Sequence, residues 1–74
     1  MPFPFDPAPA TLWTLTREDR LASCEIRFVP NGVEALVRRN GTLLYSSTFE
    51  KGDDTLEWAE SERVEMLAKG WRLR

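Results

Sequence analysis

The chain has 74 residues, which gives room for one domain with a single core, near the lower limit at which a core suffices without disulfides or metal. Its 42% hydrophobic and 11% aromatic content argues against intrinsic disorder, and its net charge of -2 provides none of the basic excess that attracts nucleic acid. The single cysteine excludes an intramolecular disulfide, and no apolar run is long enough to span a bilayer, so we expect a cytoplasmic protein without a membrane segment.

The first ten residues differ from the rest in composition, because they contain four prolines, at positions 2, 4, 7 and 9. Proline fixes φ and removes a backbone donor, so neither a helix nor a strand can run through this segment. We therefore expect a proline-rich N-terminal arm over residues 1–10 and a single α+β domain over residues 11–74. Phe3 and Phe5 of the arm can pack either on the domain itself or on a partner.

From residue 11 onward, apolar and polar residues alternate with a period of two, and turn signals interrupt the pattern at short, regular intervals. This pattern predicts a four-stranded antiparallel meander with strands at about 11–17, 20–29, 33–39 and 42–49. Asn31-Gly32 and Asn40-Gly41 are typical of tight type I′ hairpin turns, whereas the link around Glu18-Asp19 is a weaker signal.

If each link is a two-residue turn, the three registers agree on which side chains share a face. They place Leu15 opposite Ala22, Trp13 opposite Cys24, Phe28 opposite Ala35, Ile26 opposite Val37, and Val37 opposite Leu44. We expect this face to be the buried one. Pro30 leaves a second possibility for its link, a three-residue turn with a bulge that shifts the local register.

The other face of the predicted sheet mixes apolar with charged side chains. It contains Leu12, Val29, Leu36, Leu43, Tyr45 and Phe49 together with Glu25, Arg27, Glu34 and Arg38. Glu25 is expected opposite Arg38, as a cross-strand ion pair, and Leu36 is expected opposite Tyr45. One helix cannot cover both faces, so this face is either a solvent-facing side beneath the arm or a protein-binding or homodimer surface.

A C-terminal helix is predicted at about 54–69, packed on one face of the sheet. Asp53 or Asp54 can cap its start, and a glutamate three residues after Asp54 has the spacing of a capping box. Gly70 suits the left-handed position that follows a helix, with Trp71 reaching back toward the last turn.

The predicted helix has a stripe that we expect to cover the sheet. The stripe contains Leu56, Ala59, Arg63, Met66 and Leu67, with Val64 at its margin. Trp58 falls on the opposite side of the helix, where it either packs under the arm or beside Trp71, or serves as an interface residue.

The chain offers no recognisable catalytic constellation. It has no histidine, the commonest general base, and Cys24 falls inside the sheet, where an apolar setting keeps a thiol protonated and inert. The acidic residues between positions 53 and 65 are spaced around the helix and do not converge as metal ligands must. We therefore predict a protein that is not an enzyme, with no catalytic residue, no cofactor and no metal ligand.

Several segments resemble a set of small uncharacterised bacterial proteins of a single domain. The resemblance spans residues 11–71 and rests on Leu12-Trp13, residues 24–34, the Asn-Gly turn, Trp58-Ala59-Glu60 and Gly70-Trp71. It implies a bacterial, cytoplasmic, single-domain protein, and it implies no activity.

Two hypotheses of function from different classes follow. The first is a small non-enzymatic protein-interaction or accessory domain, acting as a homodimer or on another protein, with a contact surface at Leu36, Tyr45 and Trp58. The second is a nucleic-acid-associated sheet that uses Arg27, Arg38, Arg39 and Tyr45. The acidic net charge argues against the second, which would show binding with a steep salt dependence.

Overall fold

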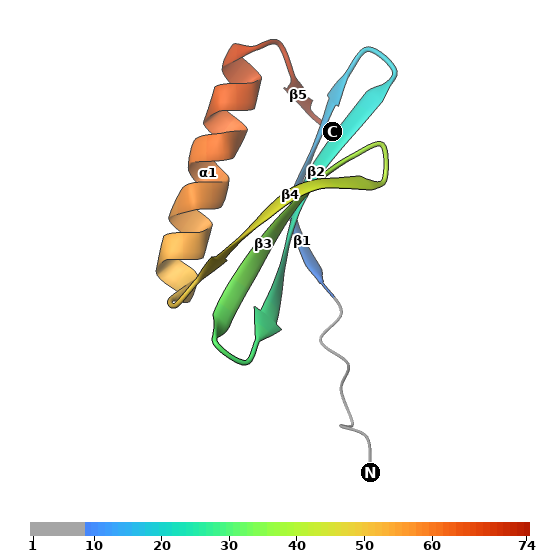
Figure 1. Ribbon diagram of the computed structural model, residues 1–74. Coiled ribbons are helices and arrows are strands. Elements are labelled where there is room, and N and C mark those ends of the chain that lie inside the picture. The colour runs from blue at the N-terminus through green and yellow to red at the C-terminus, as the bar shows by residue number, and fades with distance from the viewer. Residues whose placement is uncertain (1–8) are drawn as a thin grey trace.

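A five-stranded antiparallel sheet carries a single helix on one of its faces in the computed structural model, which describes residues 9–74 (Figure 1). Along the chain the elements are β1 (Ala10–Arg17), β2 (Arg20–Val29), β3 (Gly32–Arg39), β4 (Thr42–Phe49), α1 (Gly52–Ala68) and β5 (Arg72–Leu73). The strand order is β4-β3-β2-β1-β5, so the first four strands form the predicted meander. The predicted α+β class and the C-terminal helix are confirmed.

The short strand β5 is the element that the sequence did not predict. It pairs with Leu15 and Thr16 of β1 and so lies at the edge of the sheet opposite to β4. The predicted proline-rich arm falls mostly on residues 1–8, which lie outside the described residues. Among residues 9–74, the structure contains no helix with the length and hydropathy that a membrane span requires.

Two of the three predicted turns are confirmed. The links at residues 18–19 and 40–41 are both two-residue turns. Asn40 (φ 52°) and Gly41 (φ 85°) have the positive φ that a type I′ turn requires at both central positions. The β1–β2 register is confirmed at its two predicted pairs, Leu15 with Ala22 and Trp13 with Cys24.

The turn between β2 and β3 differs from the prediction, because it consists of Pro30-Asn31 and not of Asn31-Gly32. Proline presets φ for the first central position of a turn and has no N–H to give to a strand ladder, so Pro30 belongs in the turn. The register moves by two residues, to Ile26 with Ala35 and Phe28 with Val33. A shift of two residues keeps every side chain on its predicted face.

A β-bulge in β4 overturns the predicted pairing of this strand with β3. Val37 lies opposite Tyr45, and the register shifts directly after this pair, which leaves Leu44 as an extra residue. Because a bulge reverses the alternation on one side of it, Tyr45 moves to the side of the sheet that faces α1. The predicted pairs of Val37 with Leu44 and of Leu36 with Tyr45 are therefore wrong, and Leu36 lies opposite Ser46.

The ion pair predicted for the outer face forms diagonally instead of directly across the strands. Glu25 lies opposite Leu36, yet the Nε of Arg38 donates to Oε1 of Glu25 at 3.1 Å. Arg27 and Glu34, which are direct partners in the β2–β3 ladder, form a second ion pair. Arg27 and Arg38 are thus both engaged by carboxylates within the sheet.

The core lies between the sheet and α1. Its buried side chains are Trp13, Leu15, Ala22, Cys24, Val37, Ala59 and Trp71. The indole N–H of Trp13 donates to the backbone carbonyl of Ala59 at 3.1 Å and thereby ties β1 to α1. Phe28 and Leu44, which we expected in the core, are 69% and 48% exposed. Phe28 lies near the tip of the β2–β3 hairpin, and Leu44 occupies the bulge.

Helix α1 packs on the sheet through a face that matches the predicted stripe only in part: Ala59 is buried, and Met66 and Leu67 pack against the core as expected. Thr55 and Ala59 are its buried residues, and the ring of Trp58 packs against Tyr45, so the prediction that placed Trp58 on the far side of the helix is wrong. Leu56, which we expected against the sheet, is 50% exposed. Apolar residues lie on several sides of this helix, so their spacing did not define one face.

The start of α1 differs from the prediction, whereas its end agrees with it. Lys51 is the N-cap and makes no side-chain capping bond, so the predicted aspartate cap is wrong. The hydroxyl of Thr55 donates to the carbonyl of Lys51 at 3.1 Å. The C-terminal cap is confirmed, because Gly70 has φ 99° and the N–H of Trp71 donates to the carbonyl of Met66 at 3.1 Å.

Candidate interaction site

Strand β4 forms one edge of the sheet, and among the described strands it pairs only with β3. Its eight residues contain neither a charged residue nor a proline, and its first five residues are all exposed. Natural proteins commonly place charged residues or prolines on their edge strands, because the unpaired N–H and C=O groups of an edge readily pair with another chain. The bulge at Leu44 interrupts this edge near its start, and residues 45–49 keep a regular register.

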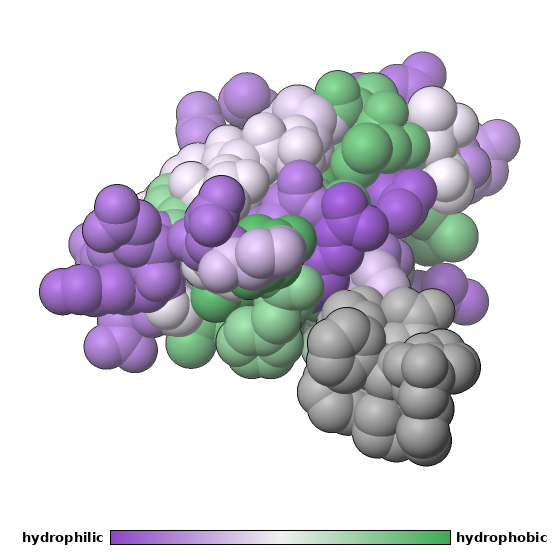
Figure 2. All heavy atoms as spheres, turned by 60° about the horizontal axis from the view of Figure 1, so that its bottom comes forward, coloured by the Kyte–Doolittle hydropathy of each residue, from purple (hydrophilic) through white to green (hydrophobic). Residues whose placement is uncertain are grey.

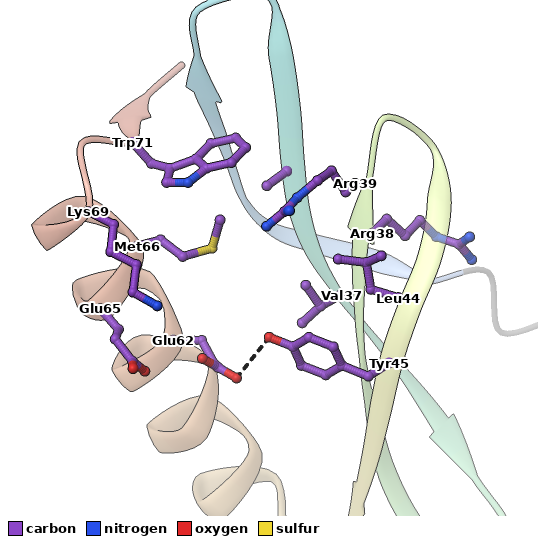
Figure 3. Close-up of a pocket in the computed structure, with 11 residues that line it drawn as sticks. Val37, Arg38, Arg39, Leu44, Tyr45, Glu62, Glu65, Met66, Lys69 and Trp71 are labelled. Atoms are coloured by element: carbon purple, nitrogen blue, oxygen red, sulfur yellow. Dashed lines mark hydrogen bonds between the residues drawn. The ribbon is translucent and has the colours of Figure 1, made fainter.

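A groove with a volume of about 380 Å³ lies between the first half of β4 and the second half of α1 (Figure 3). Leu44 and Tyr45 belong to its β4 wall, and Glu62, Met66 and Lys69 belong to its α1 wall. The groove therefore joins apolar surface to charges of both signs, directly beside the open strand edge.

Tyr45 connects the two walls of this groove. Its hydroxyl donates to Oε1 of Glu62 at 3.0 Å (Figure 3). Desolvation of the phenol, together with the hydrogen bond to Glu62, raises the pKa of Tyr45 to about 12. Trp58 packs edge-on against Tyr45 with 6.2 Å between ring centroids, and Phe49 lies 5.8 Å from Trp58. We call these three rings the aromatic cluster; it holds β4 against α1.

Two cationic side chains, of Arg39 and Lys69, lie at the end of the groove near the start of β4, and Glu65 lines the same wall as Lys69. The guanidinium of Arg39 lies 5.3 Å from the centroid of the Trp71 ring, a cation–π contact. In Figure 3, Arg39 points into the groove, whereas Arg38 points away from it. Lys69 lines the same end from α1. An anionic group of a partner would therefore be attracted to this end.

The structure brings together two of the three residues that were predicted as a contact surface. Tyr45 and Trp58 meet in the aromatic cluster, at the side of the sheet that α1 covers. Leu36 lies on the other face, opposite Ser46, and only 3% of it is exposed. Leu36 therefore offers no accessible surface for a partner.

The four residues of the nucleic-acid hypothesis do not share a face. Arg27 and Arg38 lie on the outer face, where Glu34 and Glu25 pair with them. Arg39 and Tyr45 lie on the face that α1 covers, as their buried strand partners Ala22 and Val37 show. The arrangement does not form the continuous basic and aromatic platform that single strands need.

Glu62 and Lys69 were not singled out from the sequence, and Met66 was expected only as part of the stripe that covers the sheet, although all three line the groove. The signal that could have found them is spacing, because positions 58, 62, 66 and 69 follow one another at intervals of four and three residues and so share a face of a helix. Leu44 could not have been found in this way, since its position depends on the bulge.

Cys24 is fully buried in the core, as predicted. Burial, with smaller effects of Glu62 and Glu25, raises the pKa of its thiol to about 11. The thiol is thus protonated at neutral pH and is a poor nucleophile. In the part of the chain that the structure describes, no group of three or more His, Cys, Asp or Glu side chains is placed to hold a metal ion.

Apart from the groove, exposed apolar side chains also lie at the end of the molecule where the β2–β3 hairpin turns and α1 begins. Figure 2 turns this end toward the viewer and shows hydrophobic side chains among polar ones. Phe28 and Leu56, which are 69% and 50% exposed, belong to these elements. Single exposed apolar side chains of this kind are normal on a protein surface.

Searches of protein-family models, of curated proteins and of solved structures found no match to this chain. The inference of function therefore rests on the geometry of β4 and α1.

Proposed function

We propose that the chain is a non-enzymatic protein-interaction domain that binds an extended segment of another chain along β4. The observation that carries this proposal is the open edge of β4, which is uncharged, free of proline and exposed over its first five residues. Extended segments commonly bind proteins by adding a strand to such an edge, where main-chain hydrogen bonds supply the affinity.

The groove beside β4 supports the proposal, because strand addition gains its specificity from neighbouring side-chain pockets. Leu44 and Met66 supply apolar surface, and Arg39 and Lys69 supply positive charge at the same end. The matching segment thus carries an apolar or aromatic side chain next to a carboxylate.

The state of the lone cysteine is consistent with a protein that is not an enzyme. Cys24 is fully buried and its pKa is raised to about 11, so it offers no thiolate at neutral pH. With no histidine in the chain, the commonest general base is missing as well.

Site-specific photo-cross-linking in cells tests the proposal. A photoreactive amino acid at Leu44, which is 48% exposed beside the edge, is expected to give covalent adducts with a partner protein. The matched control carries the same group at Val64 of α1, which is 54% exposed and does not line the groove. Equal adducts at the two positions, or none at position 44, would contradict the proposal.

A further inference from the structure

Residues 45–49 are the regular part of the open β4 edge. Each of them has one partner in β3, from Val37 opposite Tyr45 to Val33 opposite Phe49, without a further irregularity. At the other edge of the sheet, β5 already covers part of β1. The β4 edge is therefore the better place for a strand to add to this sheet.

We infer that the segment that binds along β4 is β4 of a second copy of this chain, paired antiparallel about a two-fold axis at Ser47. This inference rests on the proposed function, because it uses the same edge and names the partner. In this register Ser47 faces its own equivalent, Tyr45 faces Phe49 of the second copy, and Ser46 faces Thr48 of the second copy. The interface is self-complementary, as a two-fold interface must be.

The side chains on the helix side of the sheet match in this register. Tyr45, Ser47 and Phe49 share that side, because they alternate along β4 from Tyr45, whose strand partner Val37 belongs to the core that α1 covers. Tyr45 and Phe49 each belong to the aromatic cluster with Trp58. The pairing thus brings the aromatic clusters of the two copies together twice, and aromatic side chains directly opposite each other stabilise antiparallel strands.

The side chains at the middle of the edge are small. Ser46 and Ser47 present no bulk and no charge to an approaching strand. On the outer side, Ser46 and Thr48 of the second copy form a hydroxyl pair, which is favourable between antiparallel strands.

The charges at the two ends of β4 are complementary. Arg39 and Lys69 lie near its start, where Arg39 is the strand partner of Thr42. Glu50 follows its last residue, and Asp53 and Asp54 follow in the first turn of α1. Antiparallel pairing places the basic end of one copy beside the acidic end of the other, on both sides of the axis.

Sedimentation of the purified full chain over a range of concentrations tests the inference. The wild-type protein is expected to pass from monomer to dimer as its concentration rises. Ser46→Lys places like charges near each other across the axis, and we expect it to weaken dimerisation at least tenfold (~1.4 kcal/mol). The control Val64→Lys adds the same charge on an exposed part of α1 and is expected to dimerise like the wild type. Circular dichroism checks that both variants fold.

Two sedimentation results would overturn the inference. One is a wild-type protein that stays monomeric at millimolar concentration, and the other is a dimer that Ser46→Lys leaves as stable as Val64→Lys does. If the wild-type protein is monomeric but the photoreactive group at Leu44 captures a different protein, self-pairing is refuted while the proposed function stands.

An engineered disulfide tests the register itself. Ser47→Cys places two thiols directly opposite each other across the axis, whereas Ser46→Cys places them diagonally and farther apart. We expect Ser47→Cys to form an interchain disulfide under mild oxidation much faster than Ser46→Cys. The native Cys24 is fully buried, so the unmodified chain serves as the background control. Equal rates for the two variants, or no disulfide in either, would contradict an axis at Ser47.

Discussion

Gly32, the first residue of β3, approaches the end of β4 too closely for any side chain. Its φ is 149°, and a Cβ added there would lie 2.0 Å from the carbonyl oxygen of Phe49 and 3.1 Å from the Cα of Glu50. Both are backbone atoms, so no side-chain rotation can relieve the overlap. Gly32→Ala must therefore displace the backbone where β3 and β4 pair, at the end of the β4 edge.

Two costs add in Gly32→Ala. A non-glycine residue in this sparsely populated backbone region costs about 1–3 kcal/mol, and displacing packed neighbours costs about 1–3 kcal/mol more. We therefore expect the free energy of unfolding to fall by about 2–6 kcal/mol. A domain of this length has a total stability of roughly 4–11 kcal/mol, so the variant should be marginally folded.

Two other glycines serve as controls for this substitution. Gly41 has φ 85° with nothing within 4 Å of an added Cβ, so Gly41→Ala carries only the backbone cost, about 1–2 kcal/mol. Gly52 also has open space around it and begins α1, so Gly52→Ala should be neutral or stabilise by up to about 1 kcal/mol. Urea denaturation followed by circular dichroism measures all three. A Gly32→Ala variant no less stable than Gly41→Ala would refute the reasoning.

Three further predictions concern the core and the groove. Trp13→Phe removes the hydrogen bond to Ala59 and part of a buried ring, so urea denaturation should show that the free energy of unfolding falls by about 2–3 kcal/mol. A change near zero would mean that this bond does not tie β1 to α1. A thiol reagent should label Cys24 slowly in the native protein and rapidly in urea, and rapid native labelling would contradict its burial. Burial raises the pKa of Cys24 from its ordinary 9.0 to about 11. Desolvation and Glu62 raise the pKa of Tyr45 from 10.0 to about 12. Between about pH 9 and pH 12 the folded state therefore binds more protons than the unfolded state, so the free energy of unfolding should fall as the pH rises through this range. Tyr45→Phe should flatten the part of that fall above pH 10, and an unchanged profile would argue against the raised pKa of Tyr45.

The candidate site shows where sequence reasoning succeeded and where it failed. Tyr45 and Trp58 were both singled out, but they were placed on different surfaces, whereas their rings meet in the structure and Trp58 packs against the core. The error in placing Tyr45 came from the two adjacent apolar residues Leu44 and Tyr45. A bulge in β4 changes which of the two faces the core, and alternation with a period of two cannot reveal such a bulge. The same bulge separated Leu36 from Tyr45 and aligned Tyr45 with the helix.

The error on the helix had a related origin. Trp58, Glu62 and Met66 share one face at helical spacing, but Leu56 and Val64 are also apolar and lie elsewhere around the axis. With apolar residues on several sides, the hydrophobic pattern of α1 allows more than one face to pack. The surface against which α1 packs selects the face that is used, because the ring of Trp58 contacts Tyr45 and Phe49 there.

The four strands, two of the turns and the end of the helix could be predicted from the sequence, because each depends on neighbouring residues. Alternation marks a strand, Asn40-Gly41 adopts the positive φ of its turn, and Gly70 ends α1 in the left-handed conformation. Tertiary structure alone decided the bulge at Leu44, the exposure of Phe28 and the contact between Trp58 and β4. These features depend on how distant backbone segments pair and on what each face meets, and no local pattern of residues encodes that pairing.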